Sequence, residues 1–320
     1  MGTSRCIVRA GLRAQPSLQV RRRGLGSWPS LLPQKRMNQR PEEQTVIVEG
    51  LELALRVWGP EDGTPVLALH GWLDNAGTWD GLAPLLPGIR LVALDFPGHG
   101  HSMHRAASGD YAFISWLPIV HGVLDALGWT TACLLGHSMG GGVAALYAGA
   151  QSKRVERLVL VEGLGPLASE AADAPERLSR ALLQRAAPPR RPRVLPSIAE
   201  AKARRSAASP AFGEFALNAI VSRGVAHVSG GVAFTHDVRL RHASLLRMTE
   251  AQVLAVLSEV SCPTLVVRAR DGLAFPPELA RARIEALGDV RVVEVPGDHH
   301  VHLTDASCLV EAVGDFLGGR

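Results

Sequence analysis

The sequence predicts an α/β protein with a mostly parallel, doubly wound sheet and an inserted helical cap. Short apolar runs such as 65–70, 89–94 and 155–161 have the continuous hydrophobic character of parallel strands that are covered on both faces. Helical patterns lie between these runs, and strands that alternate with helices are typical of parallel sheets with right-handed crossovers. The strand pattern stops near residue 164 and resumes only near 264, which indicates an insertion.

The first part of the sheet is expected to begin with an antiparallel hairpin. Its strands, 46–48 and 53–58, are predicted to be joined by a turn at Glu49 and Gly50. After the strand at 65–70, a helix is expected over 79–86, with Pro84 kinking or shortening it. The other elements expected in this part are a strand at 89–94, a helix at 111–127, and strands at 131–135 and 155–161.

The cap is predicted from a segment in which seven prolines separate short helical pieces. Ser197 and Glu200 have the spacing of a capping box that opens one helix, and Ser209 with Pro210 is expected to open another. The sheet then resumes with strands at 264–269 and 290–295, a helix from about Pro277 and a last helix from near Thr304. The predicted division is a disordered basic extension at 1–40, a core at 41–163 and 249–320, and a helical cap at 164–248.

The net charge of +4 arises at the N-terminal end. Residues 1–41 contain nine of the 34 basic residues and no acidic residue, so the remaining 25 basic residues are outnumbered by 30 acidic ones. This distribution argues against nucleic-acid binding as the main function. Residues 1–36 are interpreted as a disordered segment that need not belong to the native protein. The alternatives are an organellar transit peptide and a tail that folds onto the domain.

Composition restricts the class of protein further. A chain of 320 residues with 47% hydrophobic content can bury a large core. No run approaches the roughly 18 consecutive apolar residues of a membrane span, so none is expected. The four cysteines have neither paired nor metal-like spacing, which favours a reducing compartment and predicts a cytoplasmic location.

A G-x-S-x-G motif at Gly136, Ser138 and Gly140 indicates a nucleophile. An apolar strand-like run precedes it and small residues follow it, which is the strand–turn–helix context of a nucleophile elbow. A serine on a sharp turn needs neighbours without side chains, so that its hydroxyl is accessible to substrate. The sequence therefore predicts Ser138 as the nucleophile and the N–H group of Met139, at the start of the following helix, as an oxyanion donor.

The base and its orienting acid are expected on loops at the carboxyl ends of the later strands. In the chain order serine, acid, histidine, Asp271 follows the strand at 264–269 and His299 follows the last strand. We therefore predict His299 as the general base and Asp271 as the acid that orients it. Glu162, after the strand at 155–161, is the alternative acid, and His300 is the alternative base.

The second oxyanion donor is expected in the loop that follows the strand ending at His70. This position assigns the backbone N–H group of Trp72. The clustered histidines have spacings that match no usual set of metal ligands, so neither a metal nor a cofactor is expected. These histidines are His99, His101, His104, His299, His300 and His302.

Three further motifs support a resemblance to a known superfamily. They are the sequence L-H-G-W-L-D-N at 69–75, the sequence D-F-P-G-H-G-H-S at 95–102 and the sequence V-P-G-D-H-H-V-H at 295–302. With the nucleophile elbow, they make residues 45–318 resemble the α/β-hydrolase superfamily, and the first and third are similar to its serine hydrolase-like proteins. The resemblance implies a serine hydrolase and favours His299 over His300 as the base.

The function predicted from these observations is hydrolysis of a small-molecule carboxylic ester through an acyl-enzyme on Ser138. A serine at the elbow argues against the epoxide hydrolase and haloalkane dehalogenase branches, which use an aspartate there. Two alternatives stay open. One is a carbon–carbon bond hydrolase of the same fold, and the other is a catalytically silent member that acts as a binding protein.

Overall fold

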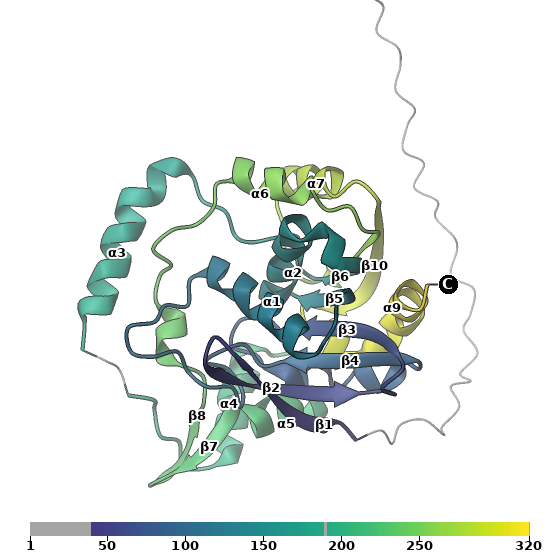
Figure 1. The fold of residues 1–320 in the computed structure, drawn as a ribbon. Helices are drawn as coiled ribbons and strands as arrows, with labels where there is room; N and C mark the ends of the chain where they lie inside the picture. The colour runs from purple at the N-terminus through teal and green to yellow at the C-terminus, as the bar shows by residue number, and fades with distance from the viewer. Residues whose placement is uncertain (1–39, 189–190, 320) are drawn as a thin grey trace, which may run out of the picture. The chain divides into compact units, whose positions relative to one another are not determined.

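The computed structural model describes residues 40–188 and 191–319, in which one large sheet forms the centre of the fold (Figure 1). Eight strands are arranged in the order β1-β2-β4-β3-β5-β6-β9-β10. β2 pairs antiparallel with β1 and β4, and all other pairs are parallel. The predicted fold class is thus confirmed. The strands are β1 (Glu42–Val48), β2 (Leu51–Trp58), β3 (Thr64–Leu69), β4 (Ile89–Leu94), β5 (Ala132–His137), β6 (Val155–Val161), β9 (Thr264–Asp271) and β10 (Val290–Asp298).

Each face of the sheet is covered by its own hydrophobic core. Alternate residues of β3 point to opposite faces: Leu67 and Leu69 belong to one core, and Val66 and Ala68 belong to the other. The first core includes residues of α1 (Trp116–Ala126), α2 (Met139–Ala150), α6 (Glu250–Leu257) and α7 (Pro277–Ala286). The second includes residues of η1 (Ala76–Trp79), η2 (Ala83–Leu85), α8 (Val301–Thr304), η7 (Ala306–Leu309) and α9 (Val310–Leu317).

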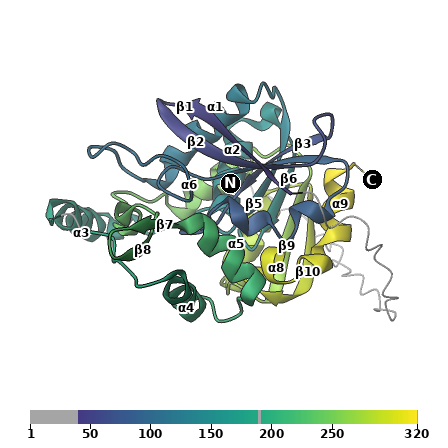
Figure 2. The same ribbon diagram turned by 90° about the horizontal axis from the view of Figure 1, so that it is seen from below.

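The segment between β6 and α6 contains helices, as expected, and also a small hairpin that the sequence pattern did not predict. Figure 2 shows these elements at one side of the sheet. Each strand of the hairpin has only four residues, and most residues of β7 are exposed. The hairpin therefore lacks the long buried run that identifies the central strands. The elements are α3 (Ala174–Ala186), α4 (Ile198–Ala208), α5 (Glu214–Gly224), β7 (Val225–Val228), β8 (Gly231–Phe234) and η6 (Val238–Arg241).

Several predicted helix boundaries were wrong for identifiable reasons. The helix expected at 79–86 is replaced by η1 and η2, two short 3₁₀ turns, because Pro84 lies in the second turn and supplies no N–H group. α5 begins at Glu214 rather than at Ser209. The helix expected at 111–127 starts with the 3₁₀ turn η3 (Phe113–Ser115) before α1.

Other local predictions are confirmed. The strands β4 and β6 have the predicted bounds. The turn between β1 and β2 is formed by Glu49 and Gly50, which have φ angles of 51° and 75°. Two consecutive positive φ angles are typical of the tight hairpin turn that matches the twist of antiparallel strands. Of the predicted capping box, the first half is present: Ser197 caps α4 by accepting a hydrogen bond from the N–H of Glu200 at 3.2 Å, and the described residues contain no return bond from the Glu200 side chain.

A buried ion pair joins α5 to the central sheet. The guanidinium Nε of Arg223 donates to Asp95, directly after β4, at 2.8 Å, and neither side chain is exposed by more than 1%. Nη1 of Arg223 also donates to Glu43 in β1 at 2.7 Å. Asp95 in turn accepts a hydrogen bond from the N–H of Ala76 at 2.7 Å. Arg223 therefore anchors the inserted segment to the core.

We expect Arg223→Met to lower the free energy of unfolding by about 3–5 kcal/mol, because Asp95 would stay buried without its charged partner. The matched control is Lys202→Met, which breaks the exposed pair of Lys202 with Glu214 in the same inserted segment and is expected to change stability little. Urea unfolding followed by circular dichroism measures both variants. Equal losses in the two would contradict the anchoring role of Arg223.

Among residues 40–188 and 191–319, no helix is both long and apolar enough to cross a membrane. Cys133, Cys262 and Cys308 are free thiols, and the first two are buried. The expectation for residues 1–36 lies outside the described part of the chain.

Candidate active site

Ser138 occupies a sharp turn between β5 and α2. Its φ and ψ angles are 51° and −113°, a strained region for a residue with a side chain. The backbone N–H of Ser138 donates to the carbonyl of Val161 at the end of β6, at 3.0 Å, and this bond helps to hold the turn. A Cβ atom at Gly140 would collide with the carbonyl oxygen of Leu69, so only glycine allows α2 to approach β3 this closely. The predicted elbow geometry is present.

His299 follows β10 and pairs with Glu162 rather than with Asp271. Nδ1 of His299 lies 3.1 Å from Oε2 of Glu162, whose side chain is almost fully buried. Asp271 is exposed at the end of β9, and within the described residues no hydrogen bond joins it to His299. The structure therefore brings the alternative acid, Glu162, against His299, and it does not bring Asp271 there.

The backbone at the end of β9 and in the loop after it explains why Glu162 is the carboxylate next to His299. The N–H groups of Ala269 and Leu273 donate to the Glu162 carboxylate at 2.6 and 2.5 Å. Between them, a Cβ atom at Gly272 would collide with the same carboxylate. The end of β9 and the loop after it thus wrap around Glu162 and supply backbone hydrogen-bond donors, while Asp271, the last residue of β9, is exposed to solvent. Charge-assisted hydrogen bonds of this kind fix the orientation of a carboxylate.

His137, immediately before the nucleophile, is a site residue that the sequence reasoning missed. Its Nε2 lies 2.8 Å from the backbone carbonyl oxygen of His299, so the ring donates to the loop that carries the base. Burial, followed by the neighbouring rings of His302, His300 and His299, lowers the pKa of His137 well below its ordinary value. The ring is therefore neutral. His137 lies between Gly136 and Ser138 of the G-x-S-x-G motif, at the end of a buried strand. This position is the feature of the sequence that could have identified it as a site residue.

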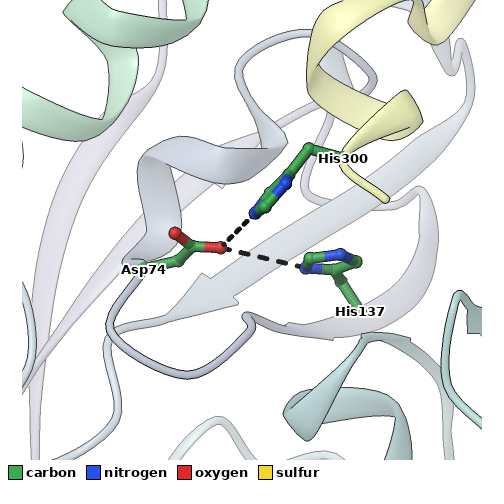
Figure 3. Close-up of side chains that lie close together, drawn as sticks. All are labelled: Asp74, His137 and His300. Carbon is green, nitrogen blue, oxygen red and sulfur yellow. Dashed lines mark hydrogen bonds and ion pairs between the residues drawn. The ribbon is translucent and has the colours of Figure 1, made fainter. Parts of the chain in front are cut away.

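His300 and His302 have different surroundings from His299. His302 is fully buried, with its Nε2 2.7 Å from the hydroxyl of Thr78, which agrees with a core position. Nε2 of His300 lies 3.2 Å from Oδ2 of Asp74, in the loop after β3 (Figure 3). Oδ1 of Asp74 accepts from Arg205 of α4 at 2.5 Å. His300 thus has its own carboxylate partner, and His299 is the histidine that faces Glu162.

The loop carrying the expected oxyanion donor Trp72 is held by two buried histidines. Nε2 of His70 accepts from the N–H of Phe96 at 3.1 Å, and Nε2 of His99 accepts from the N–H of Leu73 at 3.3 Å. The indole of Trp72 is half exposed and donates to the carbonyl of Leu240 at 3.2 Å. Trp72 lies after β3 and Met139 lies after β5, and these two strands are adjacent and parallel. The role of the two N–H groups as oxyanion donors stays a prediction.

Comparison with known proteins gives consistent matches. A family model described as the alpha/beta hydrolase fold matches residues 64–306, a range that contains Ser138, Glu162 and His299. A serine hydrolase-like protein of Danio rerio is 37% identical over 83% of this chain and 85% of its own length. A hypothetical protein of Pseudomonas aeruginosa PAO1 has a solved structure with a TM-score of 0.79, 40% identity, and coverage of 87% of this chain and 98% of its own.

A solved thioesterase domain from the curacin biosynthetic pathway is also similar. Its TM-score is 0.78 at 28% identity, and the alignment covers 85% of this chain and 99% of the domain.

Proposed function

Because the chain belongs to the α/β-hydrolase family and to its serine hydrolase-like group, we propose that it hydrolyses a small carboxylic ester through an acyl-enzyme on Ser138. The observation that carries the proposal is the 3.1 Å contact of Nδ1 of His299 with the buried Glu162 carboxylate. A ring whose Nδ1–H is held by a carboxylate has its Nε2 free to accept a proton. Ser138 on the strained elbow is the hydroxyl that this base would activate.

In the proposed reaction, Oγ of Ser138 attacks the acyl carbon of the ester while Nε2 of His299 takes the hydroxyl proton. The N–H groups of Trp72 and Met139 stabilise the negative charge that develops on the carbonyl oxygen. His299 then gives its proton to the departing alcohol. A water molecule, deprotonated by His299, then attacks the acyl carbon. The bond from this carbon to Oγ of Ser138 breaks, His299 returns the proton to Oγ, and the acid is released. The Glu162 carboxylate stabilises the imidazolium form of His299 in both halves of the reaction.

The described residues contain no hydrogen bond between the hydroxyl of Ser138 and the ring of His299. Catalytic hydrogen bonds are commonly long or misaligned without substrate and tighten in the complex. Both side chains are partly exposed to solvent. We expect substrate binding to complete this contact by rotation of the Ser138 side chain.

A thioester is the second candidate substrate class. The likeness to the thioesterase domain, at 28% identity over nearly the whole domain, favours it. The chemistry differs only in the leaving group, which is a thiolate instead of an alkoxide, so the same residues would serve. The proposal includes a cytoplasmic location, which the free thiols of Cys133, Cys262 and Cys308 support.

A fluorophosphonate probe tests the proposal, because it reacts covalently with an activated serine. We expect stoichiometric labelling of the purified full chain, with mass spectrometry locating the adduct on the peptide that contains Ser138. Matched esters and thioesters of graded acyl length would then identify the preferred class. A chain that is folded by near-ultraviolet circular dichroism but takes no label, or takes it on another residue, would contradict the proposal.

A further inference from the structure

Three potential metal ligands meet beside the catalytic residues, from segments far apart in the sequence. Asp74 lies in the loop after β3, His137 ends β5, and His300 follows β10 (Figure 3). One ligand atom from each lies within 4.8 Å of the other two. Oδ2 of Asp74 is 3.2 Å from Nε2 of His300 and 3.9 Å from Nδ1 of His137. The proposed reaction uses none of these three side chains.

The state of His137 makes its Nδ1 an electron-pair donor. Its Nε2 donates to the carbonyl of His299, so in the tautomer with a single ring proton the lone pair is on Nδ1. Nδ1 is buried, and within the described residues it has no hydrogen-bond partner. Oδ2 of Asp74, which also carries only lone pairs, lies 3.9 Å from Nδ1. Two lone-pair atoms that face each other in a buried site repel one another unless a proton or a metal cation lies between them.

Asp74 and Gly71 complete the arrangement. Because Arg205 binds Oδ1 of Asp74, the other oxygen, Oδ2, is the one directed towards the two histidines. A Cβ atom at Gly71 would lie 2.9 Å from Nδ1 of His137 and 3.2 Å from Oδ2 of Asp74. Because residue 71 is glycine, the space next to both ligand atoms is open, whereas the Cβ atom of any other residue would fill this space.

We propose that Oδ2 of Asp74, Nδ1 of His137 and Nε2 of His300 bind one divalent transition ion of the zinc class, with solvent as the fourth ligand. Two imidazoles and one carboxylate suit this class of ion. With bonds of about 2.0–2.2 Å, tetrahedral ligands lie roughly 3.3–3.6 Å apart. The three ligand atoms lie within 4.8 Å of one another, so metal binding requires side-chain rotations that bring them closer by up to roughly 1.5 Å. The ion replaces the Nε2 proton of His300 in its contact with Asp74.

The outer contacts match those of protein metal sites. A histidine ligand usually donates its second ring nitrogen to a carbonyl or carboxylate, and ligating carboxylates are themselves hydrogen-bonded. Here His137 donates to the carbonyl of His299 and Arg205 holds Asp74. The sequence predicted no metal, because ligands at 74, 137 and 300 form no local spacing motif.

A bound ion would also inhibit the hydrolase, a consequence that rests on the proposed function. The ring centroids of His137 and His299 are 4.8 Å apart, so a divalent charge would lie near the base. A positive charge at this range opposes protonation of His299, which the reaction requires. We expect Zn²⁺ to slow labelling of Ser138 by the fluorophosphonate probe, and chelation to restore it.

The direct test is titration of the chelator-treated full chain with Co²⁺ alone, followed by visible absorption. We expect one equivalent to bind with the intense bands of a four-coordinate ion, and Zn²⁺ to displace it. His300→Gln and Asp74→Asn should each weaken binding at least about tenfold. The matched control is His121→Gln on α1, which removes a partly exposed histidine paired with Asp125 and should leave binding unchanged.

The readout does not depend on hydrolysis, so failure of the metal site and failure of the proposed function are distinguishable. Absence of binding, or weak multiple binding that His300→Gln leaves unaltered, would overturn the site. If the substituted chains fail to fold, X-ray absorption of the Zn²⁺-loaded wild-type chain decides the question. Scattering from two imidazoles supports the proposal, and scattering from one or none overturns it.

Discussion

Ser138→Ala is expected to lower kcat for ester or thioester hydrolysis by about 10⁶-fold, the size of effect produced when the nucleophile of a serine hydrolase is removed. The folded state should be nearly unaffected. The Ser138 side chain makes no hydrogen bond within the described residues, and alanine adopts the positive φ of 51° at about the same cost as serine. Hydrolysis of a chromogenic ester and a thermal unfolding curve, measured on the same preparation, test both statements.

Ser102→Ala is the matched control, because it removes a serine hydroxyl that has a structural role. The buried hydroxyl of Ser102 accepts from the N–H of Ala54 at 2.9 Å and donates to the carbonyl of Asp95 at 2.6 Å. Its loss should cost about 1–3 kcal/mol of stability through the unpaired backbone groups, with kcat retained. Turnover that survives in Ser138→Ala would show that another residue is the nucleophile.

The features predicted correctly from the sequence are those determined by neighbouring residues. The elbow at Ser138 depends on glycines two positions away on each side, and that spacing is visible in the sequence. β4 and β6 have the predicted bounds, because parallel strands covered on both faces require unbroken apolar runs. The β7–β8 hairpin was missed for the opposite reason: its strands are short and partly exposed, so they leave no such run.

The choice between Glu162 and Asp271 depended on contacts that the sequence does not reveal. Glu162 follows β6 and Asp271 is the last residue of β9, and these parallel strands are neighbours, so the topology places both residues at the same end of the sheet. The backbone N–H groups of Ala269 and Leu273, together with the missing side chain at Gly272, orient the buried carboxylate. The cluster of Asp74, His137 and His300 is likewise a product of three-dimensional packing.

Glu162→Gln is expected to lower kcat by about 10⁴-fold at neutral pH, as occurs when a triad carboxylate becomes an amide. Oε1 of Glu162 accepts from Ala269, and Oε2 accepts from Leu273 and His299. An amide has only one oxygen, so one of these positions must hold an NH₂ group that faces a donor. An NH₂ group towards His299 would select the wrong tautomer of the ring. In the opposite orientation the negative charge that stabilises the imidazolium is still absent.

Asp271→Asn is the matched control, because it makes the same chemical change on the neighbouring strand. Its side chain is exposed and makes no hydrogen bond to His299, so we expect kcat to change less than about threefold, as is usual for a surface substitution. Measuring kcat and KM across pH separates a loss of base orientation from a loss of substrate binding, because a misoriented His299 lowers kcat and leaves KM largely unchanged. The reverse ranking of the two variants would return the orienting role to Asp271 and would require the loop after β9 to turn inward when substrate binds.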